Sequence, residues 1–471
     1  MLRAFSITAG ICCSILFVVI GLRYELQLYG DGALFSYSVA VQDAWAFHWH
    51  NISGRVAVYL FSLVPAEAFV ALTGSPGGGI VVYGLIFFAA PLLGLTATYA
   101  ADRSQSRVIF SYACFSTAAL CPLVFGFPTE MWLAHAVFWP ALAVAHYASL
   151  PIIGFVLVFA MLLALILTHE GAIIFAVTIV ATLLLRGRRD PAFLRAAGAL
   201  TAAMAIWVVV KVAFPPNAHF AGVFERAALN FFDFNIFNSG LFLLLFIAIA
   251  SYSAAFFFFF FARSTPAKAH IYATAMVALA LGMYWLWLDH SLHAANRYFM
   301  RTVLVGVTPV LGLLAVLFAL RTDGQLMPVP FMARVMGVFD SRVMPQAIAG
   351  AFLIVMLVHA VEAAKFVTVW TKYKTAVTAF ATGDASDPAL GDPRFVSSVR
   401  IGQDLNRLSW NSTTQFLSVI VAKFAPSRLV VDPTDYYFWL SCQTATANFN
   451  VERAVPAETR GLVRTHACLH R

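Results

Sequence analysis

The sequence has few charged residues for its length. Only 11% of its 471 residues are Asp, Glu, Lys or Arg, whereas 61% are hydrophobic and the mean hydropathy is +0.83. Soluble domains are typically about 25% charged and about half apolar. The composition therefore excludes a soluble enzyme, a disordered chain, a coiled coil and a nucleic-acid module, and it predicts a polytopic membrane protein.

Cysteine is scarce as well, with six residues in the chain. Four of them lie in apolar runs, where a free thiol behaves as a small hydrophobe: Cys12, Cys13, Cys114 and Cys121. Cys442 and Cys468 lie in polar sequence, where they could pair if that part of the chain is outside the cytoplasm. The first apolar run is not followed by a small-residue cleavage site, so we expect a retained anchor and not a signal peptide.

Long apolar runs recur from residue 4 to residue 365. A hydrocarbon core about 30 Å thick needs about 20 apolar residues per helix, and by that measure we expect about eleven membrane-spanning helices. Their ranges are approximately 4–22, 79–100, 108–126, 131–148, 152–168, 171–185, 196–213, 241–262, 271–288, 302–320 and 346–365.

The chain divides into two predicted domains. Residues 1–365 form the transmembrane domain, and residues 366–471 are too polar to lie in a membrane. In this tail, SRLVV (427–431) is typical of a short strand and DPTDYYFWL (432–440) of an N-capped helix start. We therefore expect a small mixed α/β domain outside the cytoplasm.

Lys and Arg are concentrated in four clusters between the predicted spans, and short cytoplasmic loops are enriched in these residues. The clusters are Arg103 and Arg107; Arg186, Arg188, Arg189 and Arg195; Arg263 and Lys268; and Arg321, Arg334 and Arg342. An even number of predicted spans separates each cluster from the next, so all four lie on one face beside Arg3. That face is predicted to be cytoplasmic. Because topology accounts for the net charge of +8, no basic patch is left for nucleic acid.

Residues 56–73 (VAVYLFSLVPAEAFVALT) complicate this arrangement, because they are apolar enough for a twelfth span. Counting them would place the N-terminus outside. They contain Pro65 and Glu67, and charge inside a membrane is costly. We therefore expect a helix that lies in the outer interface, within an outer loop of residues 23–78.

Four acidic or histidine residues on the predicted outer face are candidates for chemistry. Asp31, in YGDGALF, lies beyond the first span, where it is either a helix N-cap or a general base. Glu130 begins the fourth span and is either a helix-terminal cap or a functional acid. His169 and Glu170 form a turn between two very apolar helices, and charge at a membrane boundary usually has a partner. His135 and His146 are expected to be satisfied by neighbours inside a span.

Cations on the same face are candidates for binding a phosphate. Arg55 either extends to lipid headgroups or binds a phosphate with its guanidinium fork. His290 and His293, followed by Arg297 and Arg301, would place both arginines and one histidine on one helical face. His-x-x-His without a third ligand is a weak zinc signal, so a cationic patch for a phosphate is the simpler interpretation.

In this order, the features resemble the GT-C class of integral-membrane glycosyltransferases. The most similar branch contains the protein O-mannosyltransferases and the lipid A aminoarabinose transferase. The correspondence covers the spans to about residue 365 and consists of Asp31 in the first outer loop, Arg55–Tyr59 leading a predicted interfacial helix, Glu130 at the start of a span, His169–Gly171 before a very apolar helix, and Arg297–Tyr298 with Pro309 further along.

The resemblance implies transfer of a sugar from a polyprenyl-phosphate donor to a hydroxyl of a lipid, glycan or protein acceptor, with inversion. Asp31 would be the base, with Glu130, Glu170 and His169 positioning the acceptor. Arg55, Arg297, Arg301 and His293 would bind the donor phosphate. Whether Asp31 and Glu130 also hold a divalent metal is left open. The implied location is the inner membrane of a bacterium, with the N-terminus cytoplasmic and residues 366–471 periplasmic.

Three other functions are compatible with the sequence. A secondary transporter typically has charge at the bilayer midplane and inverted repeats, whereas the charges here, Lys211 and Glu362 included, lie near span ends and no repeat is visible. A lipid-linked glycan polymerase or ligase would use a large late loop with Arg and His. A catalytically inactive scaffold is the third alternative.

Overall fold

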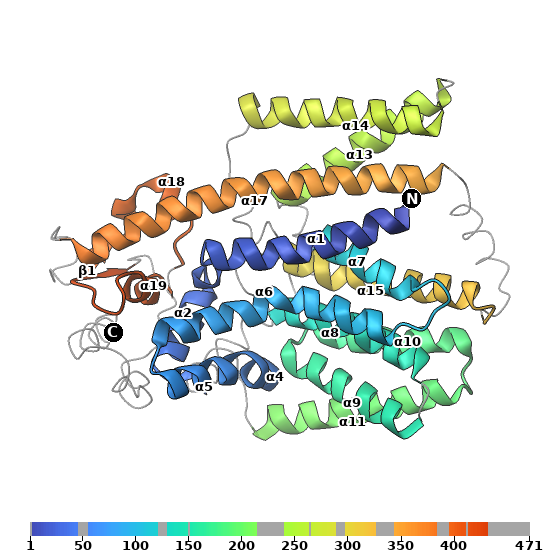
Figure 1. Ribbon diagram of the computed structural model, residues 1–471, viewed down its shortest axis with the longest axis horizontal. Coiled ribbons are helices and arrows are strands. Elements are labelled where there is room, and N and C mark those ends of the chain that lie inside the picture. Colours follow the sequence, from blue (N-terminus) through green and yellow to red (C-terminus); the bar gives the residue numbers. More distant parts are fainter. Residues whose placement is uncertain are drawn as a thin grey trace.

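The computed structural model shows an all-α membrane protein with a small C-terminal region that contains two parallel strands (Figure 1). It describes residues 2–45, 55–120, 130–148, 151–213, 240–262, 265–288, 297–325, 343–383, 395–410 and 413–431, without the side chains of 151, 297–302 and 395.

The helices follow the apolar runs of the sequence. They are α1 (Leu2–Arg23), α2 (Asp31–Ala40), α4 (Val56–Val58), α5 (Val64–Thr73), α6 (Pro76–Ala101), α7 (Val108–Leu120), α8 (Glu130–Tyr147), α9 (Pro151–Thr168), α10 (Ala172–Leu183), α11 (Pro191–Ala213), α13 (Gly240–Phe261), α14 (Pro266–Met283), α15 (Arg297–Thr322), α17 (Met344–Thr382), α18 (Gln403–Asn406) and α19 (Thr414–Val421). The strands are β1 (Phe395–Ser397) and β2 (Leu429–Val431).

Each of the predicted spans coincides with a helix, but fewer have the full length and composition of a membrane span. Among the described residues, eight helices meet those criteria: Leu2–Arg23, Val56–Thr73, Pro76–Ala101, Pro191–Ala213, Gly240–Phe261, Pro266–Leu288, Val303–Thr322 and Met344–Thr382. Val108–Leu120, Ile152–Thr168 and Ala172–Arg186 are apolar but shorter. The structure therefore confirms a polytopic helical membrane protein. The count of about eleven spans stays a prediction.

Most residues of helix α8 are buried inside the bundle. Its polar residues lower its mean hydropathy, so it is neither among the eight candidate spans nor among the shorter apolar helices. It packs against α6, α9 and α10. Trp132 and Trp139 are almost completely buried in it. His135 is buried too, with its Nε2 2.8 Å from Ser116 Oγ and 3.2 Å from Trp139 Nε1, as expected for a histidine satisfied by neighbours. The bundle, not lipid, provides these polar partners.

One end of the bundle gathers the arginine-rich turns, and we call it the arginine-rich end. The backbone N–H of Gln105 and the hydroxyl of Tyr147 both donate to Asp323, over 3.0 and 2.7 Å. Arg186 donates to the carbonyl of His146 over 2.7 Å, which brings the α10–α11 turn to the same end. In Figure 1 the start of α1 lies at this end as well. The described clusters thus share one end, as predicted; Arg263, Arg334 and Arg342 lie outside the described residues, and which end faces the cytoplasm stays a prediction.

The segment Val56–Thr73 does not run between the two ends, although its length and composition would suit a span. Thr73 leads directly into Pro76, the start of α6, at the left of Figure 1. At the other end of the segment, Arg55 pairs with Glu130, the first residue of α8. The segment lies in the half of the bundle away from the arginine-rich end, and we call that half the site end (Figure 1). By length and composition the segment is nevertheless one of the eight candidate spans, and its place in the interface stays a prediction.

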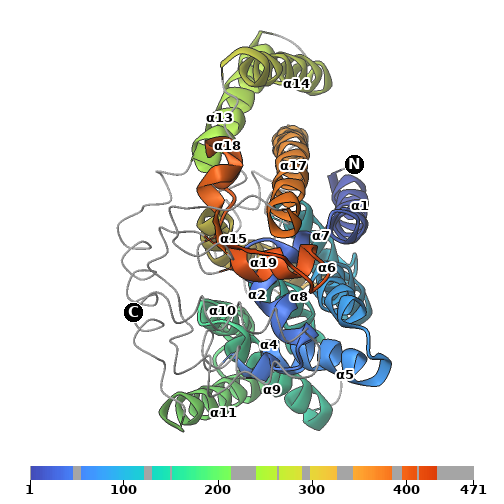
Figure 2. The ribbon, with the colours of Figure 1, turned by 90° about the vertical axis from the view of Figure 1, so that its left-hand side faces the viewer.

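The helix that ends the transmembrane domain is longer than predicted, because α17 continues past residue 365 to Thr382. Beyond it, β1 and β2 pair in parallel, with Val396 opposite Val430, and the strand predicted in SRLVV is confirmed. Helix α19 packs on α2, with the Tyr37 and Phe416 rings 5.0 Å apart. The C-terminal region therefore lies against the site end (Figures 1 and 2). The predicted helix start at 432–440, Cys442 and Cys468 lie outside the described residues.

Close packing of α6 on α8 provides a test of the bundle. A Cβ on Gly94 would lie 2.5 Å from the carbonyl oxygen of Ala136. This backbone atom can move away only if the whole helix shifts. We expect Gly94→Leu to lower the unfolding free energy by about 3 kcal/mol, because overpacking forces the two helices apart. Denaturation of the purified protein in detergent measures this loss. The control is Gly198→Leu on α11, where a Cβ meets nothing within 4 Å; equal stability of the two variants would contradict the packing.

Candidate functional site

The site is built around the guanidinium of Arg55. Its Nε and Nη2 donate to Glu170 Oε2 over 3.1 and 3.0 Å, and its Nη1 lies 3.4 Å from Glu130 Oε1. The three side chains are only 9 to 10% exposed. One buried cation thus connects two carboxylates that are distant in sequence.

A second cation reaches the cluster from α11. Lys211 Nζ lies 3.1 Å from Glu170 Oε1, so each oxygen of this carboxylate contacts a different cation. The ammonium is also 6.0 Å from the centre of the Trp207 ring, one turn earlier on the same helix. A lysine in the last turn of an apolar helix reaches a boundary charge without crossing the bundle.

The local fold explains how these side chains converge. Arg55 directly precedes α4, Glu130 is the first residue of α8, and Glu170 lies in the turn from α9 to α10. In that turn, His169 Nδ1 accepts a hydrogen bond of 2.9 Å from the backbone N–H of Gly171, which fixes the turn beside Glu170. The polar groups therefore come from helix ends, where an apolar sequence tolerates them.

Burial and charge act in opposite directions on the two central residues. Burial alone would raise the pKa of Glu170, but Arg55, His169 and Lys211 outweigh it and hold that pKa well below its usual range. Burial would lower the pKa of Arg55, whereas Glu170, Glu130 and Asp31 raise it above its ordinary value. Both side chains are consequently charged across the physiological range.

Asp31 belongs to the same electrostatic neighbourhood, since its charge acts on Arg55. It is the first residue of α2, and the N-cap position is Gly30, with φ 60°. The prediction of Asp31 as N-cap was therefore wrong. A Cβ on Gly30 would lie 3.0 Å from the Trp410 ring, so a glycine allows the C-terminal region to pack beside Asp31. Asp31 is thus a third carboxylate near Arg55, besides Glu130 and Glu170.

The predicted phosphate-binding residues of the last outer loop are placed only in part. His290 and His293 lie outside the described residues, and α15 begins at Arg297. A Cβ on Gly171 would lie 3.2 Å from the side chain of Val305, so α15 packs against the α9–α10 turn at this point. Residue 301 lies one helical turn before Val305. The start of α15 therefore lies near the turn that carries Glu170.

Two of the acids at the site are already paired with cations. Glu130 pairs with Arg55, and Glu170 pairs with Arg55 and Lys211, so a dication at either acid would compete with these cations. The described part of the chain has no group of three or more His, Cys, Asp or Glu side chains that could hold a metal ion. Whether Asp31 and Glu130 hold a metal stays an open prediction.

Sequence reasoning identified Asp31, Arg55, Glu130 and Glu170, and the structure brings them together. It overlooked Lys211, which was noted only as lying near the end of a span. The available signal was a lysine at the end of a long apolar run, because such a charge needs a partner at the boundary. It also assigned Arg55 to a phosphate, whereas the contacts of Arg55 in the described structure include two carboxylates.

Comparison with protein-family models, curated proteins and solved structures gave no match. The resemblance to the GT-C class therefore stays a prediction, and what the chain does must be argued from its residues and geometry.

The low pKa of Glu170 predicts how stability depends on pH. Above the ordinary carboxylate pKa of about 4.3, the pairs with Arg55 and Lys211 stabilise the fold, and this contribution is lost as pH falls toward the folded pKa. At pH 7 we expect Glu170→Gln to cost about 3 kcal/mol, because it leaves buried cations without their carboxylate. The difference from the unmodified protein should shrink as the pH is lowered below about 4.

Denaturation midpoints measured from pH 7 down to pH 3 check this expectation. The matched control is Asp404→Asn, since Asp404 is an exposed carboxylate on α18. A loss for Glu170→Gln no larger than that of the control at pH 7 would contradict the role of the cluster.

Proposed function

We propose that this protein is a membrane glycosyltransferase that moves a sugar from a polyprenyl-phosphate donor to an acceptor hydroxyl at the site end. The observation that carries the proposal is the convergence of Asp31, Arg55, Glu130, Glu170 and Lys211 in one cluster. Five separate segments contribute these residues, all from helix ends or the turns beside them. Such a cluster is costly in an apolar protein, and titratable groups assembled at that cost are typical of a working site.

The reaction needs one base and a set of cations. The acceptor oxygen attacks the anomeric carbon and its proton goes to a carboxylate, which we assign to Asp31. The bond between the anomeric carbon and the phosphate oxygen breaks, and polyprenyl phosphate leaves with the electron pair. Cations must stabilise the negative charge that develops on this leaving group.

We assign the charged residues near the site different roles in this reaction. Because Arg55 already pairs with Glu130 and Glu170, we assign it to positioning these acids, which would orient the acceptor. We assign the donor phosphate to Arg297 and Arg301 at the start of α15. The apolar helix surfaces around the cluster would hold the prenyl chain.

Transport is the second candidate, and one observation favours it. Glu362 of α17 is fully buried, with Lys365 Nζ and Trp285 Nε1 each 3.0 Å from its Oε1. Buried charge on a spanning helix is typical of ion and substrate pathways. The next experiment distinguishes the two functions.

Release of polyprenyl phosphate is the measurement that tests the proposal. Purified protein is incubated in detergent with radiolabelled polyprenyl-phosphate sugars and a mixture of lipid, glycan and peptide acceptors. We expect release that falls at least about 100-fold in Asp31→Asn, because a general base contributes about that much, and that is unaffected by EDTA. Asp404→Asn is the control and should retain full activity.

Two results would contradict the assignment. Release that is equal in Asp31→Asn and the control would remove Asp31 as the base. No release from any donor, together with accumulation of substrate in proteoliposomes that depends on Glu362, would establish transport instead.

A further inference from the structure

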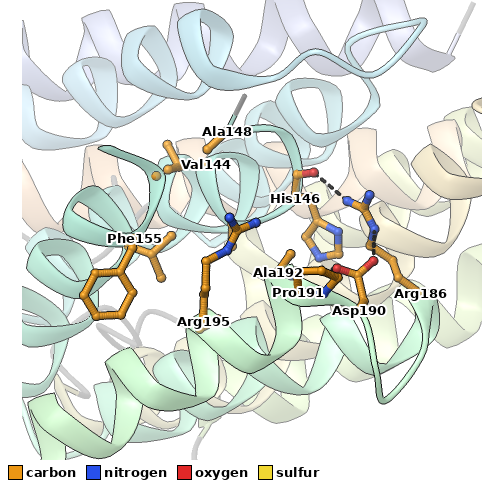
Figure 3. Close-up of a pocket in the computed structure, with 13 residues that line it drawn as sticks. Val144, His146, Ala148, Phe155, Arg186, Asp190, Pro191, Ala192 and Arg195 are labelled. Carbon is orange, nitrogen blue, oxygen red and sulfur yellow. Dashed lines mark hydrogen bonds and ion pairs between the residues drawn. The ribbon is translucent and has the colours of Figure 1, made fainter. Parts of the chain in front are cut away.

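A cavity of about 280 Å³, shown in Figure 3, lies beside the α10–α11 turn at the arginine-rich end. It lies between the end of α8, the start of α9 and the α10–α11 turn with the start of α11. Its polar lining consists of His146, Arg186, Asp190 and Arg195. Its apolar lining includes Val144, Phe155 and Val158.

The charges in this cavity do not cancel. Arg186 Nε is 3.2 Å from Asp190 Oδ2, and Asp190 Oδ1 accepts a 2.7 Å hydrogen bond from the backbone N–H of Ala192, so this carboxylate is engaged. Arg195 has no hydrogen bond or ion pair with any residue the structure describes. The cavity therefore offers one uncompensated positive charge, which matches a ligand with a single negative charge.

His146 adds an acceptor to the same cavity. Its Nε2 lies 3.0 Å from Thr182 Oγ1, and that hydroxyl donates its own proton to the carbonyl of Ile179 over 2.7 Å. Nε2 must then carry the proton of a neutral imidazole, and Nδ1 is left with a lone pair. Nδ1 is buried without a partner in the described structure, and the ring lies between Arg186 and Arg195 in Figure 3. A buried acceptor of this kind is satisfied by a hydroxyl donor.

The outer wall of the cavity indicates how a ligand would reach it. Phe155 lines the cavity and is also 38% exposed on the outer surface of α9. Next to it Ile152, Ile153 and Val156 are exposed apolar residues on the same helix. In a membrane this surface faces acyl chains, so the cavity connects a polar lining to the hydrocarbon. Basic pockets between membrane helices are known to bind lipid headgroups.

We propose that this cavity binds the headgroup of a monoanionic phospholipid, with Arg195 on its phosphodiester and His146 Nδ1 accepting from a headgroup hydroxyl. The lipid would stabilise the junction of α8, α9 and α11 at the end opposite the cluster. This inference is independent of the proposed function.

Thermal shifts of the purified protein in detergent test the proposal with three probes. Dioctanoyl phosphatidylglycerol has the charge and the hydroxyl, dioctanoyl phosphatidylmethanol has the charge only, and inorganic phosphate lacks the chains. We expect phosphatidylglycerol to raise the denaturation midpoint most and inorganic phosphate least. Inorganic phosphate that acts as strongly as phosphatidylglycerol would identify a free-phosphate site and overturn the lipid assignment, and equal effects of the two lipids would overturn the role of His146.

Arg195→Gln is the decisive variant, and Arg189→Gln, in the same turn but exposed and outside the lining, is its control. We expect Arg195→Gln to weaken the apparent affinity for phosphatidylglycerol about tenfold, because a charge-assisted pair is lost, while Arg189→Gln leaves it unchanged. Ala192→Leu, which fills the cavity and keeps both arginines, should weaken binding as well. Unchanged affinity in both Arg195→Gln and Ala192→Leu would overturn the proposal.

Discussion

The ion pairs of Arg55 constrain the site end of this protein, because a guanidinium that is about 10% exposed must keep carboxylates beside it. Leaving such a charge unpaired costs several kcal/mol. The start of α8 and the α9–α10 turn, which supply Glu130 and Glu170, are therefore held near the segment that leads into α4. Lys211 extends the same constraint to the end of α11. A site that depends on four converging segments is fixed in shape before any ligand arrives.

The two ends of the bundle use charge differently. At the site end, acids and cations are paired with one another around Arg55, and Asp31 acts on the same guanidinium. At the arginine-rich end, topology requires positive charge, and Arg195 remains without a described partner beside a cavity. The chemistry that we propose for each end follows from this difference: an acceptor hydroxyl at one, and an anionic headgroup at the other.

Hydropathy predicted the helices well, because a continuous apolar run leaves little alternative to a helix in a membrane. It also predicted α8, although Glu130, His135 and His146 make this helix less hydrophobic than the eight full-length candidate spans. However, it ended α17 too early. Residues 366–382 are more polar than a span, yet Trp370 and Tyr373 are buried there.

The candidate site was predicted in its members but not in its contacts. Charges at helix boundaries are conspicuous in an apolar sequence, so Asp31, Arg55, Glu130 and Glu170 could be selected one by one. Their pairing depends on which helices are neighbours, and local sequence does not encode that. For this reason Arg55 was assigned to a phosphate and Lys211 was set aside.

A double-mutant cycle between Arg55 and Glu170 measures the central constraint most directly. Arg55→Met, Glu170→Met and the double variant are compared by their unfolding free energies in detergent. If the pair holds the site end together, the double variant is less destabilised than the sum of the single variants, by at least about 2 kcal/mol, because it leaves no buried charge between these two positions. Additive losses would show that the two residues do not depend on each other and would contradict this account.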